Sequence, residues 1–300
     1  MNYESGSYKL FKICNIVLLF IIVVIMVFPY LNVLAYAFND GLDSQFGGIS
    51  IFPRVWTLDN FKVLIENREI INATIISVLR VIFGTIFALI VQFTSAYAFT
   101  QKGFKGKSVI LMFLMIPMYF GGGLIPIYLL YSKMHLLNNF LVYVLPVSFS
   151  LYNMVIIRSY LYSIPESLAE SARLDGANEI IIMLKVYIPL SIPILAVMAL
   201  WTAVGLWNDW TTTLFFITNH KLYTLQFILM QILKEGERIA KLLEEALIAG
   251  KQIDMSSQPK VTPQAIRYAE IILTTIPIVI VYPFLQKHFV KGVTLGAVKE

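Results

Sequence analysis

Charged residues are scarce in this sequence. Only 14% of the 300 residues are Asp, Glu, Lys or Arg, whereas 58% are hydrophobic, and soluble domains carry about 25% charged residues. There is a single cysteine, Cys14, so the chain can form neither an intramolecular disulfide nor a cysteine metal cluster. The net charge of +5 comes from basic residues scattered around apolar runs, which argues against nucleic-acid binding. The composition predicts an integral membrane protein.

Motifs for catalysis are also missing. No Gly-rich phosphate loop ends in lysine and serine or threonine, so the chain does not bind ATP by that motif. No His-Glu-x-x-His spacing occurs, and the topology described below puts His288 on the opposite side of the membrane from His135 and His220. No Gly-x-Ser-x-Gly elbow occurs either. We therefore expect no catalytic residue, metal or cofactor in this chain, and a partner must supply any energy it uses.

Apolar runs predict six membrane spans in an all-α fold, since a helix needs about 20 residues to cross a bilayer. The first run follows Lys9 and Lys12 and imitates a signal peptide, but it is longer than the roughly 7–15 apolar residues of a signal sequence. We therefore expect a cytoplasmic N-terminus at 1–12 and a single membrane domain over 13–300. The spans are expected at about 13–38, 70–99, 108–131, 139–160, 186–207 and 266–289.

Two of these spans contain unusual residues. The third includes Pro117 and the glycines 121–123, so it cannot be a straight helix throughout. The second contains Arg80, which is costly in lipid. Arg80 is either a cavity-lining cation or, as we favour, an interfacial residue near the outer end of the span, where its long side chain reaches water.

The loops set the expected orientation. Residues 101–107 carry three lysines and no acid, which places this loop in the cytoplasm together with both termini. Residues 208–265 then form an outer loop with helical structure. Its apolar segment 222–233 is too short to cross the membrane, and we expect the charged residues 234–238 to end it. A helical pattern resumes at Ile239, and a loose stretch follows at 255–259.

The one long polar interruption in mid-sequence is residues 163–193. Ser163 followed by Glu166 has the spacing of a capping box, which predicts the start of a helix. Gly176 can adopt the left-handed conformation that ends a helix, and Asn178 is a candidate cap for a second helix that reaches Lys185. The pattern predicts two short helices outside the bilayer, before Pro189 leads into the fifth span.

This stretch resembles the EAA signature of permease subunits in binding-protein-dependent ABC importers. The resemblance rests on Glu170-Ser171-Ala172, then Gly176, then residues 186–189, with serine in place of the usual second alanine. Residues 57–61 and 282–299 resemble the sugar-type permeases, and the tail resembles the subgroup for complex oligosaccharides, related to the maltose-importer permeases. The resemblance implies the type I ABC importer permease fold, with residues 163–185 as a coupling loop.

The resemblance also implies partners. They are a second, homologous permease subunit, two cytoplasmic ATPase subunits that bind ATP and Mg, and an extracellular or periplasmic sugar-binding protein that delivers an oligosaccharide. The chain is expected in the cell membrane, where the coupling loop docks on an ATPase subunit and transmits its motion to the spans. The residues expected to serve this coupling are Glu166, Glu170, Ala172, Asp175, Gly176, Ala177 and Pro189.

Amide and aromatic side chains near the spans are candidates for a sugar path, since sugars are recognised by hydrogen bonds and aromatic faces. They can equally belong to an interfacial belt or hold helices together. These candidates are Gln92, Tyr152, Asn153, Trp207, Asn208 and Trp210.

Two other functions are weighed. An ion-driven secondary transporter would need paired carboxylates within its spans, and only Glu270, near a span end, is available. A structural membrane-assembly subunit would not need the spacing of the coupling loop.

Overall fold

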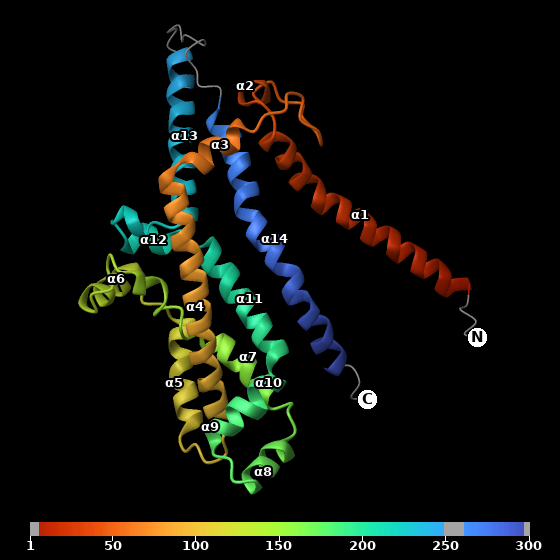
Figure 1. The fold of residues 1–300 in the computed structure, drawn as a ribbon, viewed down its shortest axis with the longest axis vertical. Coiled ribbons are helices and arrows are strands. Elements are labelled where there is room, and N and C mark those ends of the chain that lie inside the picture. Colours follow the sequence, from red (N-terminus) through yellow and green to blue (C-terminus); the bar gives the residue numbers. More distant parts are fainter. Residues whose placement is uncertain (1–5, 249–260, 297–300) are drawn as a thin grey trace. The chain divides into compact units, whose positions relative to one another are not determined.

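The computed structural model describes residues 6–248 and 261–296 of the chain (Figure 1). In this part of the chain the only β structure is one antiparallel bridge between Asn39 and Trp56. The chain divides into two compact units. One comprises Met1–Arg68 and Leu229–Ile276, and the other Glu69–Ile228 and Pro277–Glu300.

The helices in chain order are α1 (Gly6–Ala37), α2 (Gly41–Ser44), α3 (Asp59–Glu66), α4 (Arg68–Thr100), α5 (Lys107–Tyr119), α6 (Leu124–Lys133), α7 (Leu151–Leu161), α8 (Glu166–Leu174), α9 (Glu179–Ile182), α10 (Ile188–Leu190), α11 (Ile192–Asn208), α12 (Thr211–Phe216), α13 (Leu225–Ile248) and α14 (Pro263–Gly296). Short 3₁₀ segments cover Phe140–Tyr143 and His220–Leu222, and a π-helical turn covers Met183–Tyr187.

Three of these helices are each long and apolar enough to cross a membrane, namely α1, α4 and the first part of α14. Two bent pairs bring the total among the described residues to as many as five. α5 and α6 meet at 117°, and the α9–α10 segment meets α11 at 79°. The bend between α5 and α6 falls at the glycines 121–123, which confirms the prediction that the third span is not a straight helix.

The fourth predicted span differs from a single helix. Residues 139–160 begin with the 3₁₀ segment and continue through turns to α7, which has 11 residues. Pro146 lies in the turns and has no backbone N–H to donate. The hydroxyl of Ser150 then caps α7 by accepting a bond from the Asn153 amide. Local turn and cap chemistry therefore divides this apolar run.

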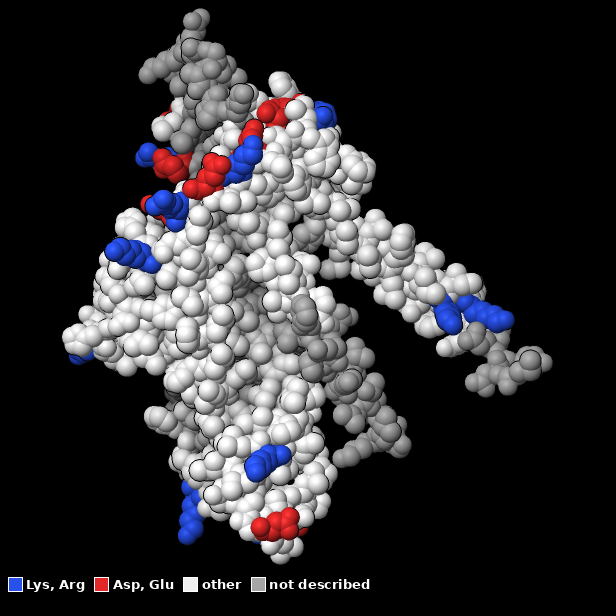
Figure 2. Space-filling view, in the orientation of Figure 1, with Lys and Arg blue, Asp and Glu red and all other residues white. Residues whose placement is uncertain are grey.

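The first unit is joined by contacts around the ends of α1, α13 and α14. The ring of Tyr36 on α1 stacks on Tyr268 of α14, with 4.8 Å between centroids. α13 and α14 approach so closely that a Cβ on Gly236 would lie 2.6 Å from Pro263. Residues 8–31 of α1 are all exposed within the described chain. Figure 2 shows this uncharged surface, with basic side chains only near the N-terminal end of α1. Such a helix belongs in lipid or against another protein.

The second unit is built around α4. Buried residues recur on α4 every three or four positions, as expected for a helix with one inward face, and they are Ala73, Ser77, Arg80, Gly84, Ala88, Gln92 and Ala96. Toward Thr100 the core of this unit combines α4 with α7, α8, α9 and α11, through Phe93, Tyr97, Met154, Ile157, Ala169, Ile182 and Met198. The two short helices α8 and α9 therefore belong to the same core as the spans.

One predicted break is wrong. α13 is continuous from Leu225 to Ile248, so the charged residues 234–238 do not end a helix. Arg238 instead pairs with Glu235 one turn away, at 3.3 Å. Charge keeps a segment out of lipid, but it does not prevent helix formation. The loose stretch expected at 255–259 lies outside the described residues.

Candidate functional site

The polar stretch at 163–185 folds as two short helices joined by a tight turn. α8 ends at Leu174, and Gly176 has φ +82°, the left-handed conformation that ends a helix. The Ala177 amide donates to the Ala172 carbonyl at 2.9 Å and closes the turn. Asn178 caps α9 by accepting from the Ile181 amide at 2.9 Å. The predicted roles of Gly176 and Asn178 in the local structure are confirmed.

The predicted capping box at the start of α8 is wrong. The Ser163 hydroxyl donates backward to the Tyr160 carbonyl at 2.7 Å, and Pro165 stands at the cap position without a side-chain bond. Glu166 is drawn away by Lys102, whose ammonium donates to its carboxylate at 2.7 Å. A lysine on another loop competes better for this carboxylate than the backbone amide does, because both partners of that hydrogen bond are charged.

The predicted coupling residues lie on different faces of the coupling loop. Ala172 and Ala177 pack against the chain's own core, whereas Glu170, Asp175 and Gly176 are exposed. Leu174, at the tip between α8 and the turn, is 89% exposed. Among the described residues, this is the highest exposure of any large apolar side chain. Pro189 is exposed in α10, close to the bend into α11.

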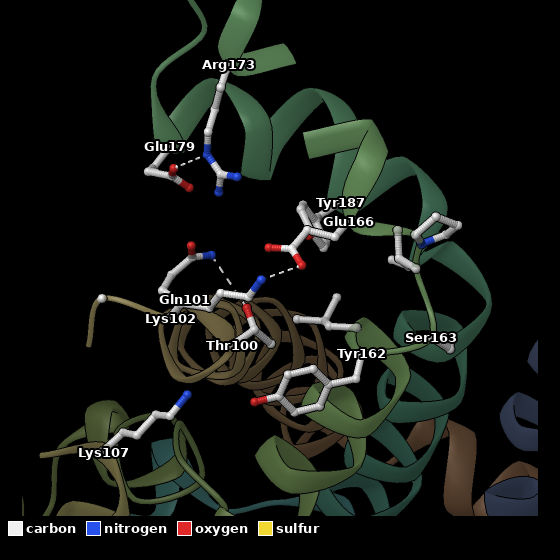
Figure 3. Close-up of a pocket in the computed structure, with 14 residues that line it drawn as sticks. Thr100, Gln101, Lys102, Lys107, Tyr162, Ser163, Glu166, Arg173, Glu179 and Tyr187 are labelled. Atoms are coloured by element: carbon white, nitrogen blue, oxygen red, sulfur yellow. Dashed lines mark hydrogen bonds and ion pairs between the residues drawn. The ribbon is translucent and has the colours of Figure 1, made fainter. Parts of the chain in front are cut away.

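A cavity of about 820 Å³ lies between the coupling loop and the loop after α4 (Figure 3). Its polar lining combines Lys102 of the α4–α5 loop and Lys107 at the start of α5 with Glu166, Arg173 and Glu179 from the coupling loop. Lys102 pairs with Glu166 between the two loops, and Arg173 pairs with Glu179 within the coupling loop (Figure 3). The two loops therefore share one side of the second unit.

Glu179 connects three helices. Its Oε1 accepts from Arg173 Nε of α8 at 2.9 Å, and its Oε2 accepts from the Tyr97 hydroxyl of α4 at 2.6 Å. These two hydrogen bonds lower the pKa of the Glu179 carboxyl below its usual value, with partial burial opposing them. Sequence reasoning missed Tyr97, Lys102, Arg173 and Glu179. Tyr97 and Glu179 are 82 residues apart, and no local pattern connects them.

The candidates for a sugar path do not form one cluster. Gln92 and Trp207 are buried inside the second unit, while Asn208 is exposed and bonds back to the Val204 carbonyl. Trp210 and Asn153 are partly buried. Tyr152 is different, because about half of its surface is exposed and its ring stacks on Trp201, with 6.3 Å between centroids and 13° between planes. Trp201 was not among the predicted residues.

The Arg80 side chain is packed inside the second unit and does not reach water, which corrects the favoured prediction. This side chain is 2% exposed and forms an ion pair with Asp209, just after α11. Its guanidinium also lies 4.6 Å from the centroid of the Tyr143 ring. Asp209 is 129 residues away in sequence, and its carboxylate begins α12 by accepting from the Thr211 and Thr212 amides. A buried cation needs such a counter-charge.

Helical spans organised around an EAA-type coupling loop define the permease class of ABC importers. A family model described as "Binding-protein-dependent transport system inner membrane component" matches residues 81–295, and the chain belongs to this family. It has the type I ABC importer permease fold. Membership implies that it works with another permease component, an ATPase and a binding protein.

Relatives from Bacillus subtilis (strain 168) match over nearly their full length. The chain is 33% identical to Protein LplC, covering 99% of this chain and 97% of LplC. It is 30% identical to the polygalacturonan/rhamnogalacturonan transport system permease protein YtcP, covering 97% of this chain and 99% of YtcP. The crystal structure of a bacterial ABC transporter involved in the import of the acidic polysaccharide alginate contains a chain that matches with a TM-score of 0.82 and 26% identity. The match covers 96% of this chain and 100% of that one. The chain is a sugar-import permease of this family.

Proposed function

We propose that this chain is one of two homologous permease subunits of an ATP-driven importer that moves an oligosaccharide across the cell membrane. An extracellular or periplasmic binding protein delivers the sugar, and two cytoplasmic ATPase subunits bind ATP and Mg and supply the energy. The ATPase subunits act on the chain through the coupling loop. Both chain termini lie in the cytoplasm. The chain itself catalyses no reaction.

The observation that carries this proposal is the construction of the coupling loop. Its inner face is fixed to the core through Ala169, which is buried, and its tip presents Leu174 next to Asp175 and Gly176. An apolar centre with a polar rim is the usual arrangement of a protein–protein interface. A rigid base with an exposed tip suits a part that receives force from a partner.

The orientation is supported by the contact between two loops. The positive-inside rule favours a cytoplasmic position for the lysine-rich loop at 101–107, and Lys102 pairs with Glu166 of the coupling loop. The two loops therefore lie on the same side of the membrane. This is the side on which ATP is available.

The substrate class is supported by Tyr152 and Trp201. Two nearly parallel rings, each about half exposed, offer the flat aromatic surface on which sugar rings stack. Asn153, the next residue on α7, carries an amide that can bond to sugar hydroxyls. The names of YtcP and of the alginate importer both indicate acidic polysaccharides. The sugars to be tested therefore include acidic oligosaccharides beside neutral ones.

The experiment is uptake by proteoliposomes that contain the complex purified through a tag on this chain. We expect an ATPase to co-purify and ATP to drive uptake of a member of a panel of maltodextrin, galacturonan and alginate oligosaccharides. Leu174→Asp should release the ATPase, because a charge replaces the apolar tip. An assembly without an ATPase, or uptake driven by an ion gradient without ATP, would overturn the proposal in favour of a secondary transporter.

The turn of the coupling loop provides a second test of the proposed function. Gly176 has open space around it, so a Cβ meets no neighbour, but its positive φ strains any β-branched residue. Gly176→Val should therefore lower the sugar transported per ATP hydrolysed. Gly176→Asn is the matched control, since asparagine tolerates this conformation. Equal coupling in the two variants would show that the shape of the turn is not required.

A further inference from the structure

The end of α4 is joined to the coupling loop by one carboxylate. Each oxygen of Glu179 binds a different element, Oε2 the Tyr97 hydroxyl of α4 at 2.6 Å and Oε1 the Arg173 guanidinium of α8 at 2.9 Å. Glu179 itself lies in the first turn of α9. Helix α4 and the two neighbouring helices of the coupling loop, α8 and α9, therefore meet at a single side chain.

The three groups are held in place by their surroundings. Tyr97 is only 5% exposed, and its ring packs edge-on against Tyr187 with 5.0 Å between centroids. Glu179 follows the Asn178 cap, which fixes the first turn of α9. Both hydrogen bonds involve the charged carboxylate, and bonds of this type are about twice as strong as those between neutral groups. A buried hydroxyl also has a high cost if its partner is removed.

A second link between the same elements is weaker. Lys102 and Glu166 join the α4–α5 loop to α8, but their side chains are 81% and 48% exposed. Exposed ion pairs of this kind contribute little, because water and salt screen them. The Arg173–Glu179 pair is also partly exposed, at 39% and 51%, and lies within the coupling loop. Among the polar contacts between this loop and α4, the bond from the buried Tyr97 to Glu179 is therefore the strongest.

We infer that Tyr97, Glu179 and Arg173 are positioning residues that fix the coupling loop to the end of α4, so that a displacement of this loop moves α4 with it. The inference rests on the proposed function, because the ATPase supplies the displacement. None of the three residues needs to touch the ATPase or the sugar. Their role is to keep α8, α9 and the end of α4 in one geometry.

The test measures the distance between α8 and α4 in the whole complex by pulsed electron paramagnetic resonance. Spin labels are attached to cysteines that replace Ser167 on α8 and Ile90 on α4, both exposed, in a chain whose exposed Cys14 is changed to serine. Distances are recorded without nucleotide and in the ATP–vanadate state with Mg. In the otherwise unchanged chain we expect the same narrow distance distribution in both states.

Tyr97→Phe removes only the hydroxyl, and the population with a detached loop should rise about ten-fold, because the bond lost is to a charged group. Tyr187→Phe is the matched control, since the same ring pair loses its other hydroxyl. It should leave the distribution narrow. Glu179→Arg should broaden the distribution, and Arg173→Glu in the same chain should narrow it again, because exchanging the charges restores the ion pair and the Tyr97 hydroxyl can accept from the introduced guanidinium. A role in folding alone would lower the yield of the complex without this rescue.

The outcomes separate the two ideas. If no ATPase accompanies the chain, the proposed function fails and the inference fails with it. If the ATPase is present but Tyr97→Phe behaves like Tyr187→Phe, only the inference is overturned. A shift of the α8–α4 distance between the two nucleotide states in the unchanged chain would also overturn it, because the loop would then move independently of α4.

Discussion

The buried ion pair between Arg80 and Asp209 leads to a prediction whose size follows from the structure. Arg80 Nη1 donates to the Asp209 carbonyl at 2.8 Å and Nη2 donates to its carboxylate. The Arg80 side chain is almost wholly inaccessible, whereas the side chain of Asp209 is 23% exposed. Removing the carboxylate therefore leaves a cation inside the second unit without a counter-charge.

Two estimates of the cost agree. Coulomb's law for unit charges about 4 Å apart, at an effective dielectric constant of about 20, gives about 4 kcal/mol. Breaking buried ion pairs by removing one partner typically costs about 3–5 kcal/mol. Asp209→Asn should therefore lower the free energy of unfolding by about 3–5 kcal/mol. Arg80→Met should cost less, because Asp209 keeps its bonds to the Thr211 and Thr212 hydroxyls and reaches solvent.

The assay is equilibrium unfolding in mixed micelles by titration with sodium dodecyl sulfate, followed by far-ultraviolet circular dichroism. The double variant Arg80→Met/Asp209→Asn should lose less than the sum of the single losses, since it leaves no buried charge unpaired. Asp59→Asn is the control, because it breaks a well exposed pair with Lys62 and should change little. A loss below about 1 kcal/mol for Asp209→Asn, or additive single losses, would refute the reasoning.

Two further predictions concern α4 and its partner at the coupling loop. A Cβ on Gly84 would lie 2.7 Å from Leu206 Cδ1. Gly84→Val should therefore lower the free energy of unfolding by about 1–3 kcal/mol in the same assay, because the contact between α4 and α11 becomes overpacked. Leu206→Ala in the same chain should restore part of this loss, and no restoration would mean that the crossing of α4 and α11 is not the cause. The folded state lowers the pKa of Glu179 from 4.5, so its stabilising effect is complete above that value and is lost as the pH falls through the lower pKa of the folded protein. The difference in melting temperature between the unchanged chain and Glu179→Gln should therefore shrink below about pH 4.5, and a difference that grows in acid would contradict this.

Features encoded by neighbouring residues could be predicted from the sequence. Gly176 marked the end of α8, Asn178 marked the start of α9, and the glycines 121–123 marked the bend between α5 and α6. Each of these features depends on backbone conformation or on a hydrogen bond within a few residues. The three long apolar helices were predicted for a similar reason, because hydropathy along one segment is sufficient to identify a span.

Features that depend on distant partners could not be predicted. Ser163 and Glu166 have the spacing of a capping box, but Lys102, 64 residues earlier, takes the carboxylate. Arg80 was predicted to lie at the membrane–water interface, because its counter-charge is 129 residues away and could not be recognised from the local sequence. The role of Tyr97 could not be predicted for the same reason. In the sequence it is an ordinary aromatic residue of an apolar run, and only its contact with α9 distinguishes it. In each case tertiary contacts decided between alternatives that the local sequence allowed equally.

The two unpredicted contacts of α4 bear on how motion at one end of the second unit reaches the other. Arg80 and Tyr97 are 17 residues apart on one helix, about 26 Å at the α-helical rise. Between them the inward face of α4 combines Gly84, Ala88 and Ala96 with the larger Gln92 and Phe93, and Gly84 brings α11 into close contact. A helix packed in this way is too stiff to absorb a displacement along its axis, so movement imposed at Tyr97 must reach Arg80. There it meets Asp209, directly after the helix that carries Trp201. Helix α4 thus connects the coupling loop, through Asp209 and α11, with the aromatic pair that we assign to the sugar. This connection requires that the Arg80–Asp209 ion pair remain intact while α4 moves.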